Sequence, residues 1–151
     1  MSNEDMEERL KLLEDKAALL SLMNSYRSSS DRGDTDAWAD CWTGDAILEL
    51  PSEPVRLVGK ANIRERALQN KTRFKARQHV LSNLEFTVHG DTAAGTGTLV
   101  FIGLPDPRLP EKNIQFGGHY EWDYLRTNNT WKIKRMRLSI IWSGSQLPSI
   151  A

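Results

Sequence analysis

The chain has 151 residues and a mass of 17.2 kDa, which is the size of a single domain. Twenty Lys and Arg residues balance 20 Asp and Glu residues, so the net charge of zero excludes a domain-wide basic surface for nucleic acid. The single cysteine excludes a disulfide framework. The acidic N-terminus is not a signal peptide, and no apolar run approaches the ~20 residues of a membrane span, so we expect a cytoplasmic protein.

Helical periodicity dominates the first part of the chain. Residues 4–30 carry apolar side chains at steps of three and four, which predicts one long amphipathic helix. Gly33 is expected to end this helix. Asp34 or Thr35 can then cap a short second helix that extends to Trp42.

Strand periodicity dominates the second part, after a third helix predicted at residues 60–70. The predicted strands are residues 46–50, 55–58, 77–89, 93–103, 113–126 and 131–142. Helices followed by long antiparallel strands favour an α+β fold over a parallel sheet, and the Gly117-Gly118 pair predicts a bend. We expect one domain over residues 1–151, a cone-shaped α+β barrel in which a curved antiparallel sheet wraps on the long N-terminal helix and two shorter ones. Residues 143–151 are predicted to form a frayed tail.

Two residues are candidates for acid–base chemistry. His79 opens the long central strand, and Asp31 stands where the first helix ends. A carboxylate against an imidazole fixes its tautomer and raises its basicity, although periodicity alone leaves open whether the two meet. His79 could equally be a buried structural histidine and Asp31 a turn residue. His89 lies in a predicted hairpin turn, and His119 faces away from its aromatic neighbours.

Other chemistries have weaker support. The serines at residues 28–30 lack a Gly-x-Ser-x-Gly elbow, and Cys41 is expected to pack in the core. The three histidines are not spaced as metal ligands, so we expect no metal. No Gly-rich strand–helix turn indicates a dinucleotide, and we expect no cofactor. A local basic run is interpreted as a solvated face rather than a phosphate groove. It consists of Arg64, Arg66, Lys71, Arg73, Lys75 and Arg77.

The five tryptophans and the apolar last strand indicate a cavity for a lipophilic ligand. The residues expected to contact substrate are Trp42, Leu81, Tyr120, Trp122, Met136, Leu138, Ile140 and Trp142.

Five short stretches together resemble the SnoaL-like branch of the nuclear transport factor 2-like superfamily. They are residues 22–38, 44–46, 77–80, 117–124 and 128–132. The resemblance implies an α+β cone with a deep apolar pocket, and it is strongest to scytalone dehydratase, bile-acid 7α-dehydratase and hexachlorocyclohexane dehydrochlorinase. Those lyases place an Asp at the end of the first helix and a His at the start of the central strand, as Asp31 and His79 are placed here.

The same resemblance implies a role for Tyr26, which matches a pocket tyrosine of the bile-acid enzyme. Other substrate-polarising groups differ. Ile140 stands where that enzyme has an arginine, Ser30 where scytalone dehydratase has a tyrosine, and Tyr120 near that enzyme's pocket asparagine. The retained Asp31–His79 pair supports proton abstraction, and the differing groups leave the substrate unnamed.

Two classes of function follow from these observations. The first is a dehydratase or isomerase that acts on a polycyclic, terpenoid or polyketide-like molecule through Asp31, His79 and Tyr26. The second is a binding or oligomerising module, with Phe86 and Val88 predicted to face outward and require a partner. A polyketide cyclase or an epoxide hydrolase on the same fold is a further alternative. We expect a homodimer or homotrimer in either case.

Overall fold

The computed structural model describes residues 2–50 and 55–144 of the chain. The helices are α1 (Asn3–Arg32), α2 (Thr35–Asp40), α3 (Lys60–Arg73) and a short 3-10 helix, Pro110–Lys112. The strands are β1 (Trp42–Leu50), β2 (Val55–Val58), β3 (Ala76–His89), β4 (Thr92–Leu104), β5 (Ile114–Thr127) and β6 (Thr130–Gly144).

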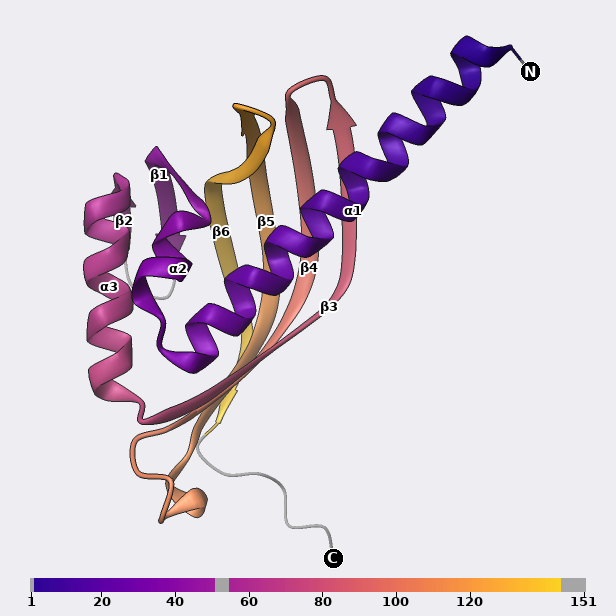
Figure 1. The fold of residues 1–151 in the computed structure, drawn as a ribbon. Coiled ribbons are helices and arrows are strands. Elements are labelled where there is room, and N and C mark those ends of the chain that lie inside the picture. The colour runs from indigo at the N-terminus through magenta and orange to yellow at the C-terminus, as the bar shows by residue number, and fades with distance from the viewer. Residues whose placement is uncertain (1, 51–54, 145–151) are drawn as a thin grey trace, which may run out of the picture.

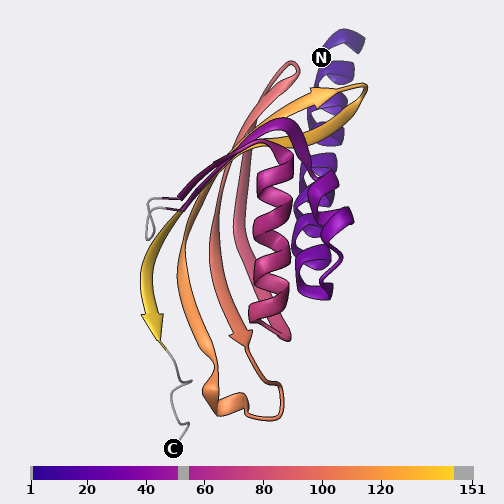
Figure 2. The same cartoon turned by 90° about the vertical axis from the view of Figure 1, so that its left-hand side faces the viewer.

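The six strands form one sheet in the order β2-β1-β6-β5-β4-β3. Neighbouring strands are antiparallel except β1 and β6, which run parallel. Figure 1 shows α1 lying across one face of the sheet, and Figure 2 shows the sheet curving around all three helices. The predicted α+β cone is confirmed, with one parallel pairing that the sequence pattern did not indicate.

The connection between α1 and α2 follows from two local residues. Gly33 takes the left-handed conformation, with φ 71°, and its N–H donates to the carbonyls of Ser29 and Ser30. This arrangement ends α1 with a residue that has no Cβ penalty there. The carboxylate of Asp34 then accepts from the N–H of Ala37 at 3.1 Å and caps α2. Both caps agree with the sequence prediction. Helix α2 stops at Asp40, however, so Trp42 opens β1 instead of ending a helix.

Helix α1 buries a narrower face than the sequence predicted. Leu19, Met23 and Tyr26 are buried against the sheet, whereas Leu10 and Leu13 are 57% and 65% exposed. The N-terminal half of the helix projects beyond the sheet, so part of the predicted apolar stripe has nothing to pack on (Figure 1). Within the described ranges, no helix is long and apolar enough to span a membrane.

A buried ion pair fixes α1 to the far end of the sheet. The guanidinium of Arg126 pairs with the carboxylate of Asp15, and Trp131 Nε1 donates to the same carboxylate at 3.2 Å. The Arg126 guanidinium also stacks 4.8 Å from the Trp131 ring. These contacts hold α1 in register with β5 and β6, which determines where its C-terminal end meets the sheet.

A bulge in β3 moves the side chains of its second half to the face opposite to the one predicted from the sequence. The register with β4 shifts between Ser82 and Glu85, and Asn83 adopts a positive φ of 54°. Alternation therefore changes sides at this point. Phe86 and Val88 pack against the core instead of facing outward, and the Phe86 ring lies 6.0 Å from the Tyr124 ring.

The C-terminal boundary also differs from the prediction. Residues 143 and 144, expected to begin a frayed tail, belong to β6. The rest of that predicted tail, residues 145–151, and residues 51–54 between the first two predicted strands lie outside the described residues.

Candidate active site

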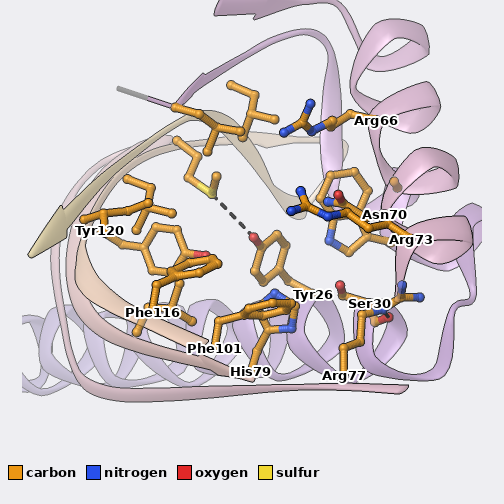
Figure 3. A pocket seen from close by; sticks show the side chains of 18 of the residues that line it. Tyr26, Ser30, Arg66, Asn70, Arg73, Arg77, His79, Phe101, Phe116 and Tyr120 are labelled. Carbon is orange, nitrogen blue, oxygen red and sulfur yellow. Dashed lines mark hydrogen bonds between the residues drawn. The ribbon is translucent and has the colours of Figure 1, made fainter. Parts of the chain in front are cut away.

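A cavity of about 250 Å³ lies between the concave face of the sheet and helices α1 and α3 (Figure 3). Its sheet side is apolar and largely aromatic, and its α3 side is polar. The lining residues are Tyr26, Ser30, Trp38, Leu48, Leu50, Arg66, Ala67, Asn70, Arg73, Arg77, His79, Leu99, Phe101, Ile114, Phe116, Tyr120, Met136, Leu138 and Ile140.

His79 and Asp31 meet at the edge of this cavity. Nδ1 of His79 lies 2.6 Å from Oδ1 of Asp31, and the side chains are only 13% and 17% exposed. The edge of the Phe101 ring packs against the imidazole, with the ring centres 4.8 Å apart. An ionised carboxylate accepts hydrogen bonds only, so this contact favours a proton on Nδ1 and leaves Nε2 as an acceptor. The pair is therefore arranged as a base with its orienting carboxylate.

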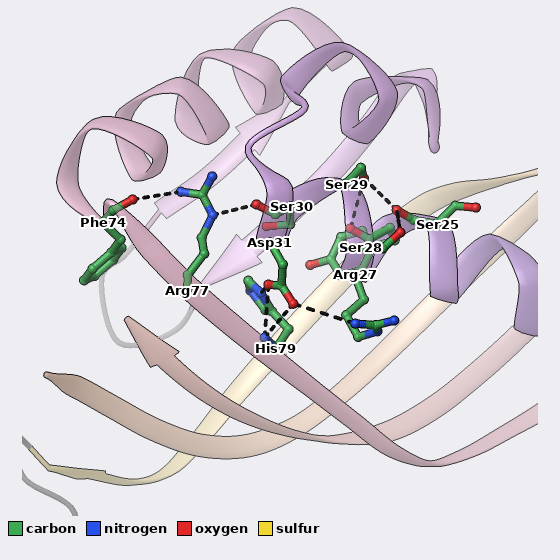
Figure 4. A network of polar contacts seen from close by, with 10 residues as sticks. Ser25, Arg27, Ser28, Ser29, Ser30, Asp31, Phe74, Arg77 and His79 are labelled. Atoms are coloured by element: carbon green, nitrogen blue, oxygen red, sulfur yellow. Dashed lines mark hydrogen bonds and ion pairs between the residues drawn. The ribbon is translucent and has the colours of Figure 1, made fainter. Parts of the chain in front are cut away.

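The dyad is held by a reciprocal clamp between α1 and the start of β3 (Figure 4). The backbone N–H of His79 donates to both carboxylate oxygens of Asp31, at 3.0 and 3.1 Å. In the opposite direction, Nε of Arg77 donates to the backbone carbonyl of Ser30 at 2.6 Å. Each segment thus supplies one side chain to the backbone of the other, and the imidazole is fixed relative to the helix end.

Tyr26 lines the cavity, and Figure 3 shows its hydroxyl directed away from His79. The hydroxyl donates to the Met136 sulfur at 3.4 Å, a weak acceptor. Burial raises the pKa of Tyr26 well above its usual value, and the nearby Tyr120 raises it further. Tyr26 is therefore a neutral hydrogen-bond donor at any physiological pH.

Tyr120 is a second neutral hydroxyl in the cavity wall. Burial raises its pKa to about 12, and the neighbouring Tyr26 hydroxyl partly offsets the effect. Its ring stacks on the buried Trp122, with the centroids 4.4 Å apart. Trp122 thus packs beside Tyr120 and supports this part of the cavity wall.

The structure places the three predicted catalytic residues and half of the eight predicted substrate-contact residues at one cavity. Tyr26, His79 and Tyr120 line the cavity, and Asp31 touches it through His79. The last strand contributes Met136, Leu138 and Ile140.

Four predicted contact residues lie elsewhere, and those predictions are corrected. Trp42 and Trp122 are buried in the core beside the cavity, where they pack on Tyr26 and Tyr120. Leu81 packs against the core without lining the cavity. Trp142 is 43% exposed.

A bulge explains the position of Trp142. Gly117 pairs with Trp142 and Gly118 pairs with Ile140, so Ile141 is the extra residue and the alternation reverses. A Cβ at Gly117 would overlap the Trp142 indole, which shows that this ring covers Gly117 on the face opposite Phe116. The predicted bend at this glycine pair is present, but its consequence for Trp142 was not anticipated.

The largest omission of the sequence analysis is the polar wall. Arg66, Asn70 and Arg73 lie on one face of α3, and Arg77 follows on β3. Residues 66, 70 and 73 are spaced i, i+4, i+7 and continue the inward face of α3 that carries Ile63 and Ala67. This spacing was the signal that could have identified them. Interpreting the whole basic run as a solvated face is therefore wrong for Arg66 and Arg77, which are partly buried, whereas Arg73 is exposed and also lines the cavity.

The remaining candidates do not line the cavity. His119 is exposed on the outer face of β5, and His89 is exposed at the end of β3. The hydroxyls of Ser28 and Ser29 donate to helix carbonyls. Cys41 is buried, and burial raises the pKa of its thiol to about 11. Among the described residues, no three His, Cys, Asp or Glu side chains gather as metal ligands would.

The model of the SnoaL-like domain matches residues 11–137. The chain belongs to the SnoaL-like family. No curated protein sequence matches it.

Three solved structures show how far this SnoaL-like chain resembles other proteins. A candidate aromatic ring hydroxylase of Novosphingobium aromaticivorans has 27% identity and a TM-score of 0.80, with 89% of this chain and 94% of the other covered. A candidate scytalone dehydratase of the same organism has 17% identity and a TM-score of 0.79, covering 92% and 95%. The LinA-type3 hexachlorocyclohexane dehydrochlorinase of Novosphingobium barchaimii has 19% identity and a TM-score of 0.79, covering 94% and 96%. At this identity, the last two establish a shared fold.

Proposed function

We propose that this SnoaL-like protein is a cofactor-independent lyase or isomerase in which His79 is the catalytic base. The observation that carries the proposal is the 2.6 Å contact between Nδ1 of His79 and Asp31, made by a ring that also lines a largely apolar cavity. Such a base needs to reach a C–H bond of a bound ligand, and the unpaired Nε2 lies on the ring edge away from Asp31. The similarity in fold to a dehydrochlorinase and a candidate dehydratase supports the same class.

The proposed elimination requires no electron acceptor. Nε2 of His79 removes a proton from carbon, and the C–H electron pair becomes the new C=C bond. The C–O bond to the neighbouring hydroxyl breaks at the same time, and Tyr26 donates a hydrogen bond to the departing oxygen. The proton on His79 then passes to the leaving hydroxide and forms water, which restores the base. In an isomerisation, His79 returns the proton to another carbon. General acid–base catalysis of this kind contributes about 10²–10⁴-fold.

The cavity also limits the substrate and the alternative chemistries. Its volume of about 250 Å³ lies at the lower end of small-molecule pockets, so a compact mono- or bicyclic ligand fits better than a large polycyclic one. An epoxide hydrolase reaction would require carboxylates in the site. Among the described residues, the cavity wall contains no Asp or Glu, and the nearest carboxylate, Asp31, is engaged by His79. Elimination or isomerisation is therefore favoured.

The proton-abstraction step can be tested without knowing the natural substrate. A panel of bicyclic ketones, such as 1-tetralone, is incubated with the protein in D₂O, and deuterium incorporation next to the carbonyl is followed by NMR. We expect the wild type to accelerate exchange for at least one ketone, and His79→Ala to lower that rate by about 10²–10⁴-fold.

His89→Ala is the matched control, because His89 lies on the same strand as His79 but is exposed far from the cavity. It should exchange as the wild type does. Equal exchange rates in His79→Ala and wild type would exclude His79 as the base. Ketone binding without exchange in any variant would favour a non-catalytic binding protein.

A further inference from the structure

The polar wall of the cavity differs from the outer surface of the protein in how its arginine charges are balanced. Arg66, Arg73 and Arg77 line this wall, together with the amide of Asn70. Figure 3 shows the guanidinium groups of Arg66 and Arg73 directed toward the cavity. Within the described residues, no Asp or Glu lines the cavity beside Arg73 and Arg77. The wall is therefore cationic toward any bound ligand.

Arginines on the outer surface form ion pairs with carboxylates. Arg64, on the same helix, lies 2.6 Å from Asp36, and Arg135 and Arg137 lie 3.0 and 2.9 Å from Glu49. By contrast, Arg77 donates hydrogen bonds to neutral groups, the backbone carbonyls of Ser30 and Phe74. Arg73 stacks on the Phe74 ring at 5.0 Å. In residues 2–50 and 55–144, neither Arg73 nor Arg77 is within ion-pair distance of a carboxylate.

Burial increases the effect of the Arg77 charge on a bound ligand. The pKa of Arg77 is lowered from its usual value by desolvation, which means that its charge lies in a medium less polar than water. A cation in such a place gains more from an anionic partner than an exposed one does, because Coulomb interactions are less screened. The carboxylate of Asp31 partly offsets this lowering of the Arg77 pKa, and it is already bonded to His79.

We propose that the substrate carries a carboxylate, which binds the arginine wall formed by Arg66, Arg73 and Arg77 while the apolar body rests on the sheet. This inference rests on the proposed function and extends it by naming a class of substrate, a compact lipophilic acid. The planar guanidinium matches a carboxylate in a fork geometry. The carboxylate is a remote handle. It orients the molecule so that the reacting carbon lies between His79 and Tyr26, and it does not itself take part in the elimination.

The test uses two probes that differ only in charge, 2-naphthoate and its methyl ester. Their dissociation constants are measured by isothermal titration calorimetry at low ionic strength. We expect wild type to bind naphthoate more tightly than the ester. Arg73→Gln should weaken naphthoate binding about tenfold or more and leave ester binding unchanged, since a hydrogen bond to a charged group is lost. Arg73→Lys should give an intermediate affinity, because lysine keeps the charge but not the fork.

Arg64→Gln is the matched control. It removes an arginine from the same helix whose partner is Asp36 on the outer surface, so neither probe should change affinity. Ester binding also reports whether each variant keeps a folded cavity. Equal affinity of wild type for the two probes, or an equal loss of both in Arg73→Gln, would overturn the proposal. Tighter, Arg73-dependent binding of 2-naphthyl phosphate would overturn the assignment to a carboxylate.

This result is separable from the outcome for the proposed function. Naphthoate binding does not involve proton abstraction, so His79→Ala, which removes a cavity-lining ring, should change the affinity for both probes by similar factors and keep the preference for naphthoate. Arg73-dependent binding with His79-independent exchange would reject only the catalytic role of His79. Loss of exchange in His79→Ala with charge-independent probe binding would reject only the carboxylate.

Discussion

The two walls of the cavity are lined by different kinds of side chain. The sheet wall consists of aromatic and aliphatic side chains, among them Phe116, Tyr120 and Leu138, and its polar atoms are buried hydroxyls. The helix wall consists of guanidinium groups and an amide, with Arg73 and Asn70 on α3. The dyad of Asp31 and His79 lies where the end of α1 joins these walls. This difference indicates that a ligand binds in one orientation, with its apolar body on the strands and its polar groups toward α3.

The sheet wall should determine stability and the binding of any apolar body. Leu138 is 4% exposed and lines the cavity. Leu138→Ala should lower the free energy of unfolding by about 2–5 kcal/mol, because it removes buried methyl groups and enlarges a void. It should also weaken the binding of naphthoate and of its methyl ester by similar factors. Urea denaturation and calorimetry measure both effects. A loss confined to the charged probe would contradict the assignment of the two walls.

The buried hydroxyls of the sheet wall predict a loss of stability at high pH. The folded-state pKa of Tyr120 is about 12, above the ordinary value of 10.0, so the folded state holds this proton more tightly. Its contribution is complete below about pH 10 and is lost as the pH rises toward 12, on the order of 2–3 kcal/mol. Tyr120→Phe should therefore flatten the fall in unfolding free energy between pH 10 and 12. An unchanged slope would show that Tyr120 ionises freely in the folded protein.

Charges on the outer face should matter least. Glu49 lies between Arg135 and Arg137, and the hydrogen bond from Arg135 is the main cause of its lowered pKa. Its contribution is present above about pH 4.5, the ordinary value for Glu, and is lost as the pH falls. Glu49→Gln should lower the unfolding free energy by no more than about 1 kcal/mol at pH 7. Neither naphthalene probe should change affinity, and a change would mean that outer charges reach the cavity.

The sequence was sufficient to predict the fold and much of the sheet wall. The helical periodicity of α1, the caps at Gly33 and Asp34, and the alternation along β5 and β6 between their bulges are local patterns, and local patterns predict which side chains point inward. Asp31 and His79 came together as a pair because a family resemblance supplied the long-range contact. Periodicity alone could not supply it across 48 residues of separation.

The errors have two physical causes. Bulges at Asn83 and at Gly117-Gly118 add one residue to a strand and reverse the alternation, which moved Phe86 inward and Trp142 outward. The arginine wall was missed because a charged run was assigned to solvent as a whole. On a helix with a buried face, however, residues 66, 70 and 73 point inward while Arg64 points out. Deciding between these requires the position of α3 over the sheet, which is a tertiary property.

The central claim is that Asp31 fixes His79 with its proton on Nδ1 and its free Nε2 toward the cavity. The most direct test is NMR of the ¹⁵N-labelled imidazole rings at a pH where they are neutral, with His79→Gln used to assign the signal. The account predicts the Nδ1–H tautomer for His79 in the wild type, and loss of that preference in Asp31→Ala. A proton on Nε2 in the wild type, unaffected by Asp31→Ala, would contradict the account, because the nitrogen facing the cavity could then accept no proton from a substrate.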